Sequence, residues 1–409
     1  MFYIFLSLFI IITDVYAYQL VKLFIKTKKL RQLYILCTIA VLGYLLFSIL
    51  NFDRTNGQNL QSLFAMGVFL TLYIPKLWIT IFLFLEDIFR VLYGVIKFNK
   101  YSALKNKVSD FLPHRTKLFG YLALIAATIH FSAFIHGIVI GRYNYRVIEQ
   151  DIVLKNLPSS FNGFKILQIS DLHLGSFDNE AKVREAINLI NAQDFDLIVF
   201  TGDIVNNKAT EATPWISILN QIKSPKYGKY SILGNHDYGE YVRFENDDSK
   251  VSNFNAIKSI HDSIGFQLLL NEHVYLKNNT DSIALIGVEN WGARFIQKGD
   301  IDKATRHVNS SDFKVVLSHD PSHFDKVLSV ADMWYDLTLS GHTHGFQFGF
   351  ELPNGFQWSP VEYVYRHWGG LYNENGRYIY VNRGFGYHGY PGRVGVWPEI
   401  TVITLKKEK

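Results

Sequence analysis

The stretch Phe164-Lys165-Ile166-Leu167-Gln168-Ile169-Ser170-Asp171-Leu172-His173 passes from a hydrophobic run directly into two side chains with metal-binding chemistry. Four further motifs follow short hydrophobic runs in the same way: Gly202-Asp203, Gly234-Asn235-His236-Asp237, His319 and Gly341-His342-Thr343-His344. Apolar runs of this length are typical of buried strands, so each motif is expected where a strand ends and a loop begins. The sequence therefore predicts one crevice that collects the polar side chains of all five motifs.

The motifs supply seven candidate metal ligands, namely Asp171, His173, Asp203, Asn235, His319, His342 and His344. Carboxylate, imidazole and amide ligands without a thiolate suit Mn, Fe or Zn, and they argue against iron–sulfur or Cu(I) chemistry. Two divalent ions that share a carboxylate would use all of these ligands and leave positions for water and substrate. The ligand set therefore predicts two divalent metal ions and cleavage of a phosphate ester.

The order Asp-x-His, Gly-Asp, Gly-Asn-His-Asp, His and Gly-His-x-His resembles the calcineurin-like metallophosphoesterase superfamily. The resemblance covers residues 145–409, and its segments at 317–321, 340–347 and 398–401 look most like the membrane-associated bacterial branch. It implies an α/β fold, the four-layer αββα sandwich, with the metals at the ends of the central strands. Phe346 departs from the usual Gly-His-Thr-His-Gly-Gly-Gln of that branch, which leaves the ligands intact but alters the surroundings of the substrate.

Carried over by position, the resemblance implies a first metal bound by Asp171, His173 and His344 and a second bound by Asn235, His319 and His342. Asp203 would bridge the two ions. His236 would stand over the scissile phosphate and protonate the leaving oxygen, and Asp237 would orient it. Because paired cations lower the pKa of a bridging water, the expected nucleophile is a metal-bridging hydroxide.

A glycine-rich segment near the C-terminus alternates with basic residues: Gly384, Gly386, Gly389 and Gly392 alternate with Arg383, His388 and Arg393. It could present backbone amides and two guanidinium groups to a phosphate, where Arg393 would offset negative charge. An ordinary surface turn is an equally good interpretation.

Four hydrophobic stretches in the first third of the chain are each long enough to cross a bilayer at about 20 residues. Their approximate limits are residues 2–21, 33–50, 62–85 and 118–140. We expect a transmembrane region with four helices over residues 1–144 and a calcineurin-like metallophosphoesterase domain over residues 145–409. Val15-Tyr16-Ala17 resembles a signal-peptide cleavage site, but no basic residue precedes the first stretch, so an uncleaved helix is expected.

Basic residues predict how these helices are oriented in the cell membrane. The segments Lys22 to Arg31 and Lys97 to Lys117 are rich in lysine and arginine, whereas the loop after the second stretch has only Arg54, opposed by Asp53. We therefore place both basic segments in the cytoplasm and the catalytic domain on the non-cytoplasmic side. Basic residues after the fourth stretch count against this orientation.

Local patterns predict further features. Asp14 and Lys76 fall near mid-membrane in the first and third stretches and predict an ion pair between the two helices. In the catalytic half, apolar spacing predicts helices over Asp178–Ala192 and Trp215–Ile222. The acidic stretch Tyr238–Asn253 is either a lid or a solvated loop, and the loop is favoured.

Charge and cysteine content exclude several classes of function. The net charge of +5 owes much to the basic segments beside the hydrophobic stretches, so it reports membrane orientation, and no nucleic-acid partner is expected. Cys37 is the only cysteine and lies inside the second stretch, which rules out an intramolecular disulfide and a structural zinc–thiolate site.

These features predict a membrane-anchored, metal-dependent phosphoric ester hydrolase that cleaves a phosphodiester or pyrophosphate bond. Aromatic residues are dense between Trp358 and Tyr390; they favour a substrate at the bilayer surface, such as a lipid or envelope precursor, although core packing explains them equally well. A cytoplasm-facing lipid A precursor (UDP-diacylglucosamine) pyrophosphatase is the alternative enzyme, and it conflicts with the predicted orientation. A non-catalytic membrane sensor of a phosphorylated ligand is the alternative of another class, against which the complete ligand set and His236 argue. The oligomeric state, the metal pair and the choice among monoester, diester and pyrophosphate stay open.

Overall fold

Hydrophobic runs from Arg146 onward form two six-stranded sheets in the computed structural model, which describes residues 2–101, 112–352 and 355–408. The chain divides into two compact units: Met1–Phe52 with Phe64–His136, and Asp53–Leu63 with Gly137–Lys409. The second unit therefore combines the C-terminal region with the loop that joins the second and third helices.

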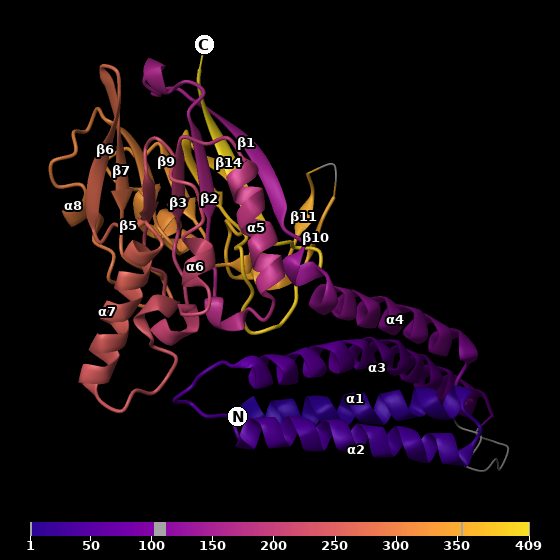
Figure 1. Ribbon diagram of the computed structural model, residues 1–409. Helices are drawn as coiled ribbons and strands as arrows, with labels where there is room; N and C mark the ends of the chain where they lie inside the picture. The colour runs from indigo at the N-terminus through magenta and orange to yellow at the C-terminus, as the bar shows by residue number, and fades with distance from the viewer. Residues whose placement is uncertain (1, 102–111, 353–354, 409) are drawn as a thin grey trace. The chain divides into compact units, whose positions relative to one another are not determined.

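The first sheet has the strand order β1-β14-β2-β3-β4-β5 (Figure 1). Its strands are β1 (Arg146–Leu154), β14 (Glu399–Lys407), β2 (Lys165–Ile169), β3 (Leu197–Phe200), β4 (Lys229–Ser231) and β5 (Gln267–Leu268). Strands β2 to β5 pair in parallel, while β14 runs antiparallel to β2 and parallel to β1. The carboxyl ends of β2, β3 and β4 therefore meet at one edge, and each is followed by one of the polar motifs.

The second sheet has the order β12-β13-β9-β8-β7-β6. Its strands are β12 (Gly370–Glu374), β13 (Arg377–Val381), β9 (Leu337–Ser340), β8 (Phe313–Leu317), β7 (Asp281–Gly287) and β6 (Glu272–Asn278). The four central strands β7, β8, β9 and β13 are parallel, so the motifs after β8 and β9 also share an edge. A separate ribbon pairs β10 (Phe350–Glu351) with β11 (Gln357–Trp358).

Three hydrophobic cores separate four layers. One core lies between the two sheets and contains residues of both, such as Leu197 of β3 and Leu339 of β9. A second core lies between the first sheet and the helices α5 (Glu180–Ala192), α6 (Ile216–Leu219) and α7 (Asp247–Ser263). A third lies between the second sheet and the helical turns α8 (Ile301–Ala304) and α9 (Pro321–His323) with the adjoining turn Phe324–Leu328. The predicted αββα sandwich is confirmed.

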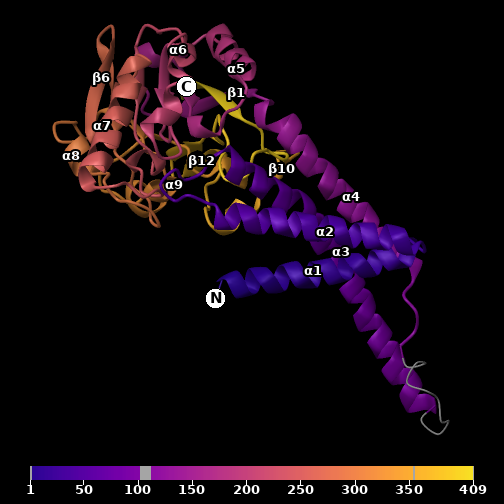
Figure 2. The ribbon, with the colours of Figure 1, turned by 60° about the horizontal axis from the view of Figure 1, so that its bottom comes forward.

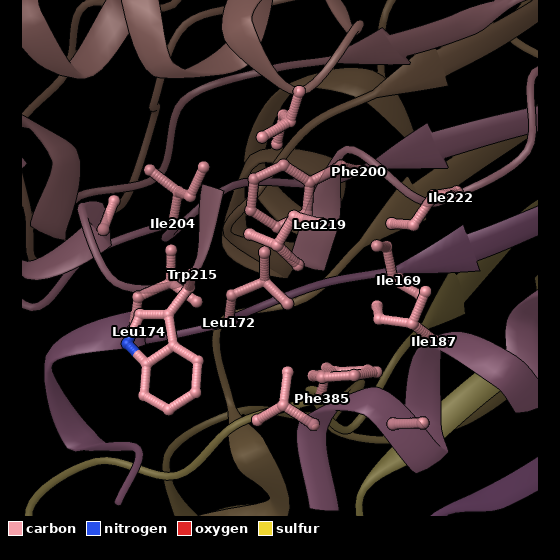
Figure 3. Close-up of a cluster of buried hydrophobic side chains, with 14 of the residues drawn as sticks. Ile169, Leu172, Leu174, Ile187, Phe200, Ile204, Trp215, Leu219, Ile222 and Phe385 are labelled. Atoms are coloured by element: carbon pink, nitrogen blue, oxygen red, sulfur yellow. The ribbon is translucent and has the colours of Figure 1, made fainter. Parts of the chain in front are cut away.

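The helix-covered core of the first sheet holds the motif-bearing strands in place (Figure 3). Ile169 at the end of β2 and Phe200 at the end of β3 pack with Ile187 of α5 and Leu219 of α6, and all four side chains are buried. Full burial of such a side chain stabilises the fold by about 1.5 to 3 kcal/mol. Truncation of Phe200 to alanine should cost about 3 to 5 kcal/mol and loosen the strand end that precedes Asp203.

The predicted helices of this region appear with adjusted limits. The helix predicted over Asp178–Ala192 is α5, which begins after Asn179 because the Asn179 side chain accepts a hydrogen bond from the amide of Lys182. The helix predicted over Trp215–Ile222 is shorter, since α6 spans only Ile216–Leu219.

The acidic stretch Tyr238–Asn253 contains the start of α7, which the sequence analysis did not predict. Asn246 caps this helix, because its side chain accepts a 2.8 Å hydrogen bond from the amide of Ser249. Asp247 and Asp248 then occupy the first turn, where carboxylates interact favourably with the helix dipole. The acidic residues that suggested a solvated loop therefore mark a helix start.

Among the residues that the structure describes, the other unit has four helices long and apolar enough to cross a membrane: α1 (Phe2–Phe24), α2 (Lys28–Leu50), α3 (Leu60–Tyr101) and α4 (Lys117–Val139). Within it, α1, α2 and α3 lie side by side (Figures 1 and 2), and α1, α3 and α4 share a small core around Leu20, Leu83 and Ala123. Of the basic segment predicted to face the cytoplasm, Lys105 and Lys107 lie outside the described residues.

The predicted ion pair between the first and third helices is present. Lys76 Nζ lies 2.6 Å from Asp14 Oδ1, and the Tyr73 hydroxyl lies 3.3 Å from the other carboxylate oxygen. A second charged cluster ties α3 to the start of α4, where Arg115 contacts Glu86 at 3.1 Å and Asp87 at 2.6 Å. Because these charges neutralise one another, their role is structural.

Candidate metal centre

Five of the predicted ligands adopt a left-handed backbone conformation. The φ angles are 53° at Asp171, 48° at His173, 62° at Asp203, 74° at His342 and 50° at His344. Residues with a side chain adopt such angles at a cost of about 1 to 3 kcal/mol, and they do so mostly at functional sites. The strain is therefore concentrated where β2, β3 and β9 end and the motifs begin.

Close contact between the loops demands glycine at one position. Gly202 has φ 98°, and a Cβ atom there would lie 2.6 Å from the backbone nitrogen of Gly234 and 2.8 Å from the ring of His319. The loops after β3, β4 and β8 consequently approach one another as closely as their backbones permit.

The side chain of Asp203 belongs to one group of potential ligands and also approaches the other. In one group, Asp171, His173 and His344 each place a ligand atom within 4.8 Å of the others, and Asp203, His319 and His342 form the second group. Asp203 Oδ2 lies 3.6 Å from His173 Nε2 and 3.1 Å from His319 Nε2. A single carboxylate thus contacts residues of both groups.

Two buried polar atoms point to a bound cation. Asn235 Oδ1 and His344 Nε2 have no hydrogen-bond partner among the residues that the structure describes. The amide nitrogen of Asn235 donates to the Tyr241 hydroxyl at 2.8 Å, which leaves the amide oxygen for another partner. An unsatisfied buried polar atom costs about 1 to 3 kcal/mol, and coordination to a metal would remove that cost. The residues present therefore fit divalent metal ions.

Hydrogen bonds at Nδ1 orient two of the imidazole rings. His319 Nδ1 lies 2.7 Å from the carbonyl oxygen of Thr201, and His173 Nδ1 lies 3.1 Å from Asn206 Oδ1. Both rings thereby direct Nε2 toward Asp203, as is usual for metal-binding histidines. His342 is placed differently, because its Nε2 lies 2.8 Å from the Tyr365 hydroxyl.

Burial and charge tune these groups for cation binding. Burial lowers the pKa of His173 to about 3 and the pKa of His342 to about 4, so both rings are neutral and their lone pairs are available. Burial also lowers the pKa of His319, but Asp203 and Asp171 outweigh it and raise this pKa to about 10. The negative potential that favours a proton on His319 would equally attract a divalent cation.

His236 lies at the edge of the centre with its ring fixed at one nitrogen. Its Nδ1 lies 2.8 Å from the carbonyl oxygen of Asn206, and its ring centroid lies 4.9 Å from that of His173. The side chain is only partly buried, in contrast to Asp171 and Asp203. This partial exposure would let His236 contact a substrate, unlike the fully buried ligand candidates.

The structure assigns Asp237 a different contact from the one predicted. Its carboxylate accepts hydrogen bonds from the backbone amides of Asp203 at 3.0 Å, Ile204 at 2.9 Å and Gly234 at 2.8 Å. Within the described residues none of its hydrogen bonds reaches the ring of His236, which is held by the Asn206 carbonyl instead. Asp237 therefore fastens the loop after β4 to the loop after β3.

The sequence analysis missed Asn206 and did not place His388. Asn206 contacts His173 through its side chain and His236 through its carbonyl, and its only signal in the sequence is its place three residues after Asp203. The ring of His388 is stacked on His173 with centroids 4.7 Å apart and lies 4.5 Å from the ring of His236.

The glycine-rich segment is neither a phosphate clamp nor a surface turn. Arg393 is fully buried, and its guanidinium donates to the carbonyl oxygens of Gly386 at 2.6 Å and Gly384 at 3.0 Å. Arg383 pairs with Glu399 at 2.7 Å. Both guanidinium groups thus hold the C-terminal segment together, and Arg393 Nη2 also lies 3.1 Å from His344 Nδ1. Because Arg393 is fully buried, it has no exposed surface for direct contact with a substrate.

The aromatic residues of the same region mostly serve packing. Trp368, Tyr387 and Tyr390 are buried, whereas Tyr363 is 77% exposed. Core packing, the more conservative of the two interpretations, therefore explains most of this cluster.

Comparisons with known proteins agree with this geometry. Residues 1–142 match a family described as probable calcineurin-like phosphoesterase, transmembrane domain, and residues 164–346 match the calcineurin-like phosphoesterases. The metallophosphoesterase YkuE of Bacillus subtilis is 33% identical over 260 residues, which cover 63% of this chain and 84% of that protein. A metallophosphoesterase of Helicobacter pylori is 30% identical over 301 residues, covering 72% of this chain and 74% of the relative.

A vertebrate relative combines both regions in its name. A transmembrane protein with metallophosphoesterase domain from Danio rerio is 28% identical over 281 residues, and the match covers 67% of this chain and 60% of that protein. The four apolar helices and the two matched regions make the chain a multi-pass membrane protein. It belongs to the calcineurin-like phosphoesterases and is a metal-dependent phosphoester hydrolase.

Proposed function

We propose that the chain hydrolyses a phosphodiester or pyrophosphate bond in a lipid or cell-envelope precursor on the non-cytoplasmic side of the membrane. The position of Asp203, which belongs to one ligand group and also approaches the other, carries the hydrolytic part of this proposal, because a shared carboxylate is what a two-metal site requires. The substrate and the orientation rest on the further observations below.

We assign Asp171, His173 and His344 to one divalent metal and Asn235, His319 and His342 to the other, with Asp203 shared. Manganese, iron and zinc all accept such oxygen and nitrogen ligands. When bound, such a pair supplies an activated water and offsets the charge that develops on the phosphoryl group.

His236 is the proposed general acid. Because the Asn206 carbonyl accepts a hydrogen bond at Nδ1, a proton on Nδ1 is fixed and Nε2 becomes the atom that gains and loses a proton. The protonated ring can then donate from Nε2 to the leaving oxygen. Asp237 supports this step indirectly, since it accepts hydrogen bonds from backbone amides of the loop after β3 and of the loop after β4, which carries His236.

A basic pocket next to Tyr365 favours a substrate larger than a simple monoester. The pocket has a volume of about 410 Å³, and Arg294, Lys326 and Arg366 are among the residues that line it. Tyr365 also lines it and contacts His342, so the pocket adjoins the proposed second metal. Asp325 and Glu374 also line the pocket, and Glu374 pairs with Arg366 at 2.7 Å. Arg294 and Lys326 would therefore stabilise additional negative charge, such as the second phosphoryl group of a pyrophosphate.

The packing of the loop Asp53–Leu63 supports a topology in which the chain crosses the membrane an even number of times between this loop and the catalytic domain. The loop packs within the same compact unit as Gly137–Lys409, so the bilayer cannot separate the two. Together with the basic segment Lys22 to Arg31, this favours both on the non-cytoplasmic face. We retain residues 1–144 and 145–409 as the two domains. The loop Asp53–Leu63 belongs to the first domain in sequence but packs against the second.

A short connection favours a substrate in the same membrane. Helix α4 ends at Val139 and β1 begins at Arg146, and an extended chain spans at most about 3.3 to 3.6 Å per residue. The catalytic domain is therefore held near the bilayer, where a lipid-linked substrate has a high effective concentration.

Turnover by the detergent-purified full chain with added Mn²⁺ tests the proposal. The substrates are p-nitrophenyl phosphate, bis(p-nitrophenyl) phosphate and a polyprenyl pyrophosphate, with the His236→Ala variant as the background control. We expect the diester and the pyrophosphate to be cleaved faster than the monoester. Cleavage of the monoester alone would contradict the proposal, and selective cleavage of UDP-diacylglucosamine would favour the lipid A precursor alternative.

A further inference from the structure

The loop that joins α2 to α3 is docked on the catalytic domain. Leu63 is 2% exposed and belongs to the same hydrophobic core as Leu172 and Leu174, which flank His173. The backbone amide of Arg243 donates a 2.9 Å hydrogen bond to the carbonyl oxygen of Arg54. These contacts place both ends of the loop against segments of the candidate metal centre.

Gly57 shows how closely the loop approaches. It is buried with φ 66°, and a Cβ atom at this position would lie 2.4 Å from Val242 Cγ1 and 3.1 Å from Asn207 Nδ2. Val242 lies shortly after the Gly-Asn-His-Asp motif, and Asn207 follows Asn206. At Gly57 the α2–α3 loop is thus packed against the segments that follow β3 and β4, and the wild-type packing leaves no room there for a side chain.

Gln58 uses both ends of its amide within the site. Its Nε2 lies 3.1 Å from His388 Nδ1 and 3.2 Å from Ser176 Oγ. Its Oε1 accepts a 2.8 Å hydrogen bond from the backbone amide of Gly389. One side chain from the membrane region therefore connects the loop after β2 with the segment that carries His388.

His388 transmits this contact to the reacting groups. Its ring is stacked on His173 at an interplanar angle of 25° and meets His236 at 65°, with centroids 4.7 Å and 4.5 Å away. Its backbone amide donates to Gln347 Oε1 at 2.6 Å, so its main chain is anchored independently. Nδ1 of His388 lies 3.1 Å from Gln58 Nε2 and 3.3 Å from Asn206 Oδ1, so Gln58 and Asn206 together orient the ring.

We propose that the α2–α3 loop forms one wall of the catalytic site and that Gln58 is a positioning residue, which holds the His388 ring against His236. The catalytic site is then incomplete without the transmembrane region. The inference rests on the proposed role of His236 as general acid, because the held ring restricts where His236 can deliver its proton. Partners that orient a ligand or catalytic side chain typically contribute 10- to 100-fold to activity.

The kinetic test uses the full chain in detergent with Mn²⁺ and compares Gln58→Ala, His388→Ala and the double variant. Methyl p-nitrophenyl phosphate and methyl phenyl phosphate differ only in their leaving groups, and the phenolate depends more on protonation. We expect Gln58→Ala to lower kcat about 10-fold, with a larger loss for the phenyl ester and little change in KM. In the double variant, the loss should equal that of His388→Ala alone, because Gln58 acts through His388.

Asn56→Ala is the matched control in the same loop, since Asn56 is exposed and its side chain donates to Asp53. It should retain wild-type kinetics. Equal losses in Asn56→Ala and Gln58→Ala, additive losses in the double variant, or equal losses for both esters would overturn the positioning role. An unchanged kcat in Gln58→Ala would overturn it as well.

Docking of the loop has a second test that needs no activity. In a Cys37→Ser background, Arg54→Cys and Arg243→Cys place one cysteine on each side of the contact, where the two backbones share a hydrogen bond. After oxidation and proteolysis between the two sites, the fragments should stay joined until reduction. Separate fragments would disprove the docked loop. Joined fragments from a protein that cleaves no diester would retain the docked loop and reject the proposed function.

Discussion

The backbone amide of His236 donates a 2.8 Å hydrogen bond to Oδ1 of Asp203. The other oxygen of the same carboxylate faces His173 and His319. One side chain therefore fixes the loop that carries the proposed acid and contributes to both ligand groups. Loss of this carboxylate should affect metal binding and the position of His236 together.

Asp203→Ala should abolish both metal content and hydrolysis. The substitution removes the shared ligand and leaves the buried rings of His173 and His319 without their carboxylate. Asp203→Asn is the matched control, since it preserves shape and an acceptor for the His236 amide but removes the charge. Elemental analysis of the purified variants should show metal loss in both. Two metals per chain in the alanine variant would exclude Asp203 as the shared ligand.

His236→Ala should keep its metals and lose turnover by about 10² to 10⁴, the usual contribution of a general acid. The reason is that the ring lies beside the ligand groups and is fixed by the Asn206 carbonyl. Metal content and kcat are measured on the same preparation. His236 also lies near His173 and His388 with ligand geometry, so a parallel loss of metal would make it a ligand instead.

Sequence motifs were sufficient to predict which side chains converge, for a simple physical reason. Strands β2, β3 and β4 are parallel neighbours, so the residues that follow them, such as Asp171, Asp203 and Asn235, emerge at one edge. The ion pair of Asp14 and Lys76 was predictable too, because an isolated charge in a membrane needs a partner.

Contacts of side chains outside the strand-end motifs and the membrane helices were not predictable. Gln58 and His388 are 330 residues apart. Gln58 belongs to no motif, and the glycine-rich segment that contains His388 gives no sign of this partner. Arg393 looked like a phosphate ligand because its charge is visible in the sequence, whereas the carbonyl oxygens that surround it depend on the course of the chain. The family resemblance assigned Asp237 to His236, yet its carboxylate accepts hydrogen bonds from backbone amides.

Glu211→Gln should make stability less dependent on pH. Burial raises the pKa of Glu211 from 4.5 to about 7, against the lowering effect of the backbone amides of Lys208, Asn206 and Asn207. The folded state therefore favours the protonated acid, and its contribution to stability is complete below pH 4.5 and is lost as the pH rises to about 7. The shift corresponds to about 3 kcal/mol at 1.36 kcal/mol per unit.

Melting temperatures of wild type and Glu211→Gln in detergent, measured at pH 5 and pH 8, test this expectation. The glutamine variant, which is neutral at both values, should gain on the wild type as the pH rises. Comparing the two proteins cancels the titration of all other groups. A constant difference between them would mean that Glu211 is ionised in the fold throughout this range.

The proposed orientation makes Asn279 and Thr55 accessible from outside the cell. Both are exposed, Asn279 at the turn between β6 and β7 and Thr55 in the α2–α3 loop. In a Cys37→Ser background, a cysteine at either position should react with a membrane-impermeant thiol reagent in intact cells. Labelling of both only after lysis would reverse the orientation and favour the cytoplasmic lipid A precursor alternative. Labelling of only one of the two cysteines would contradict the proposal that the α2–α3 loop and the catalytic domain lie on the same side of the membrane.

Kinetics in liposomes should distinguish a membrane substrate from a soluble one. If the short connection after Val139 holds the domain at the bilayer, the encounter with a lipid-linked substrate depends on its mole fraction in the membrane. Dilution of such a pyrophosphate with inert phospholipid at constant bulk concentration should therefore lower its turnover in proportion. Turnover of bis(p-nitrophenyl) phosphate in the same liposomes should stay unchanged. The full chain is used throughout, because removal of the membrane region would also remove Gln58. If the lipid-linked substrate responded only to its bulk concentration, the membrane region would have no role in substrate delivery.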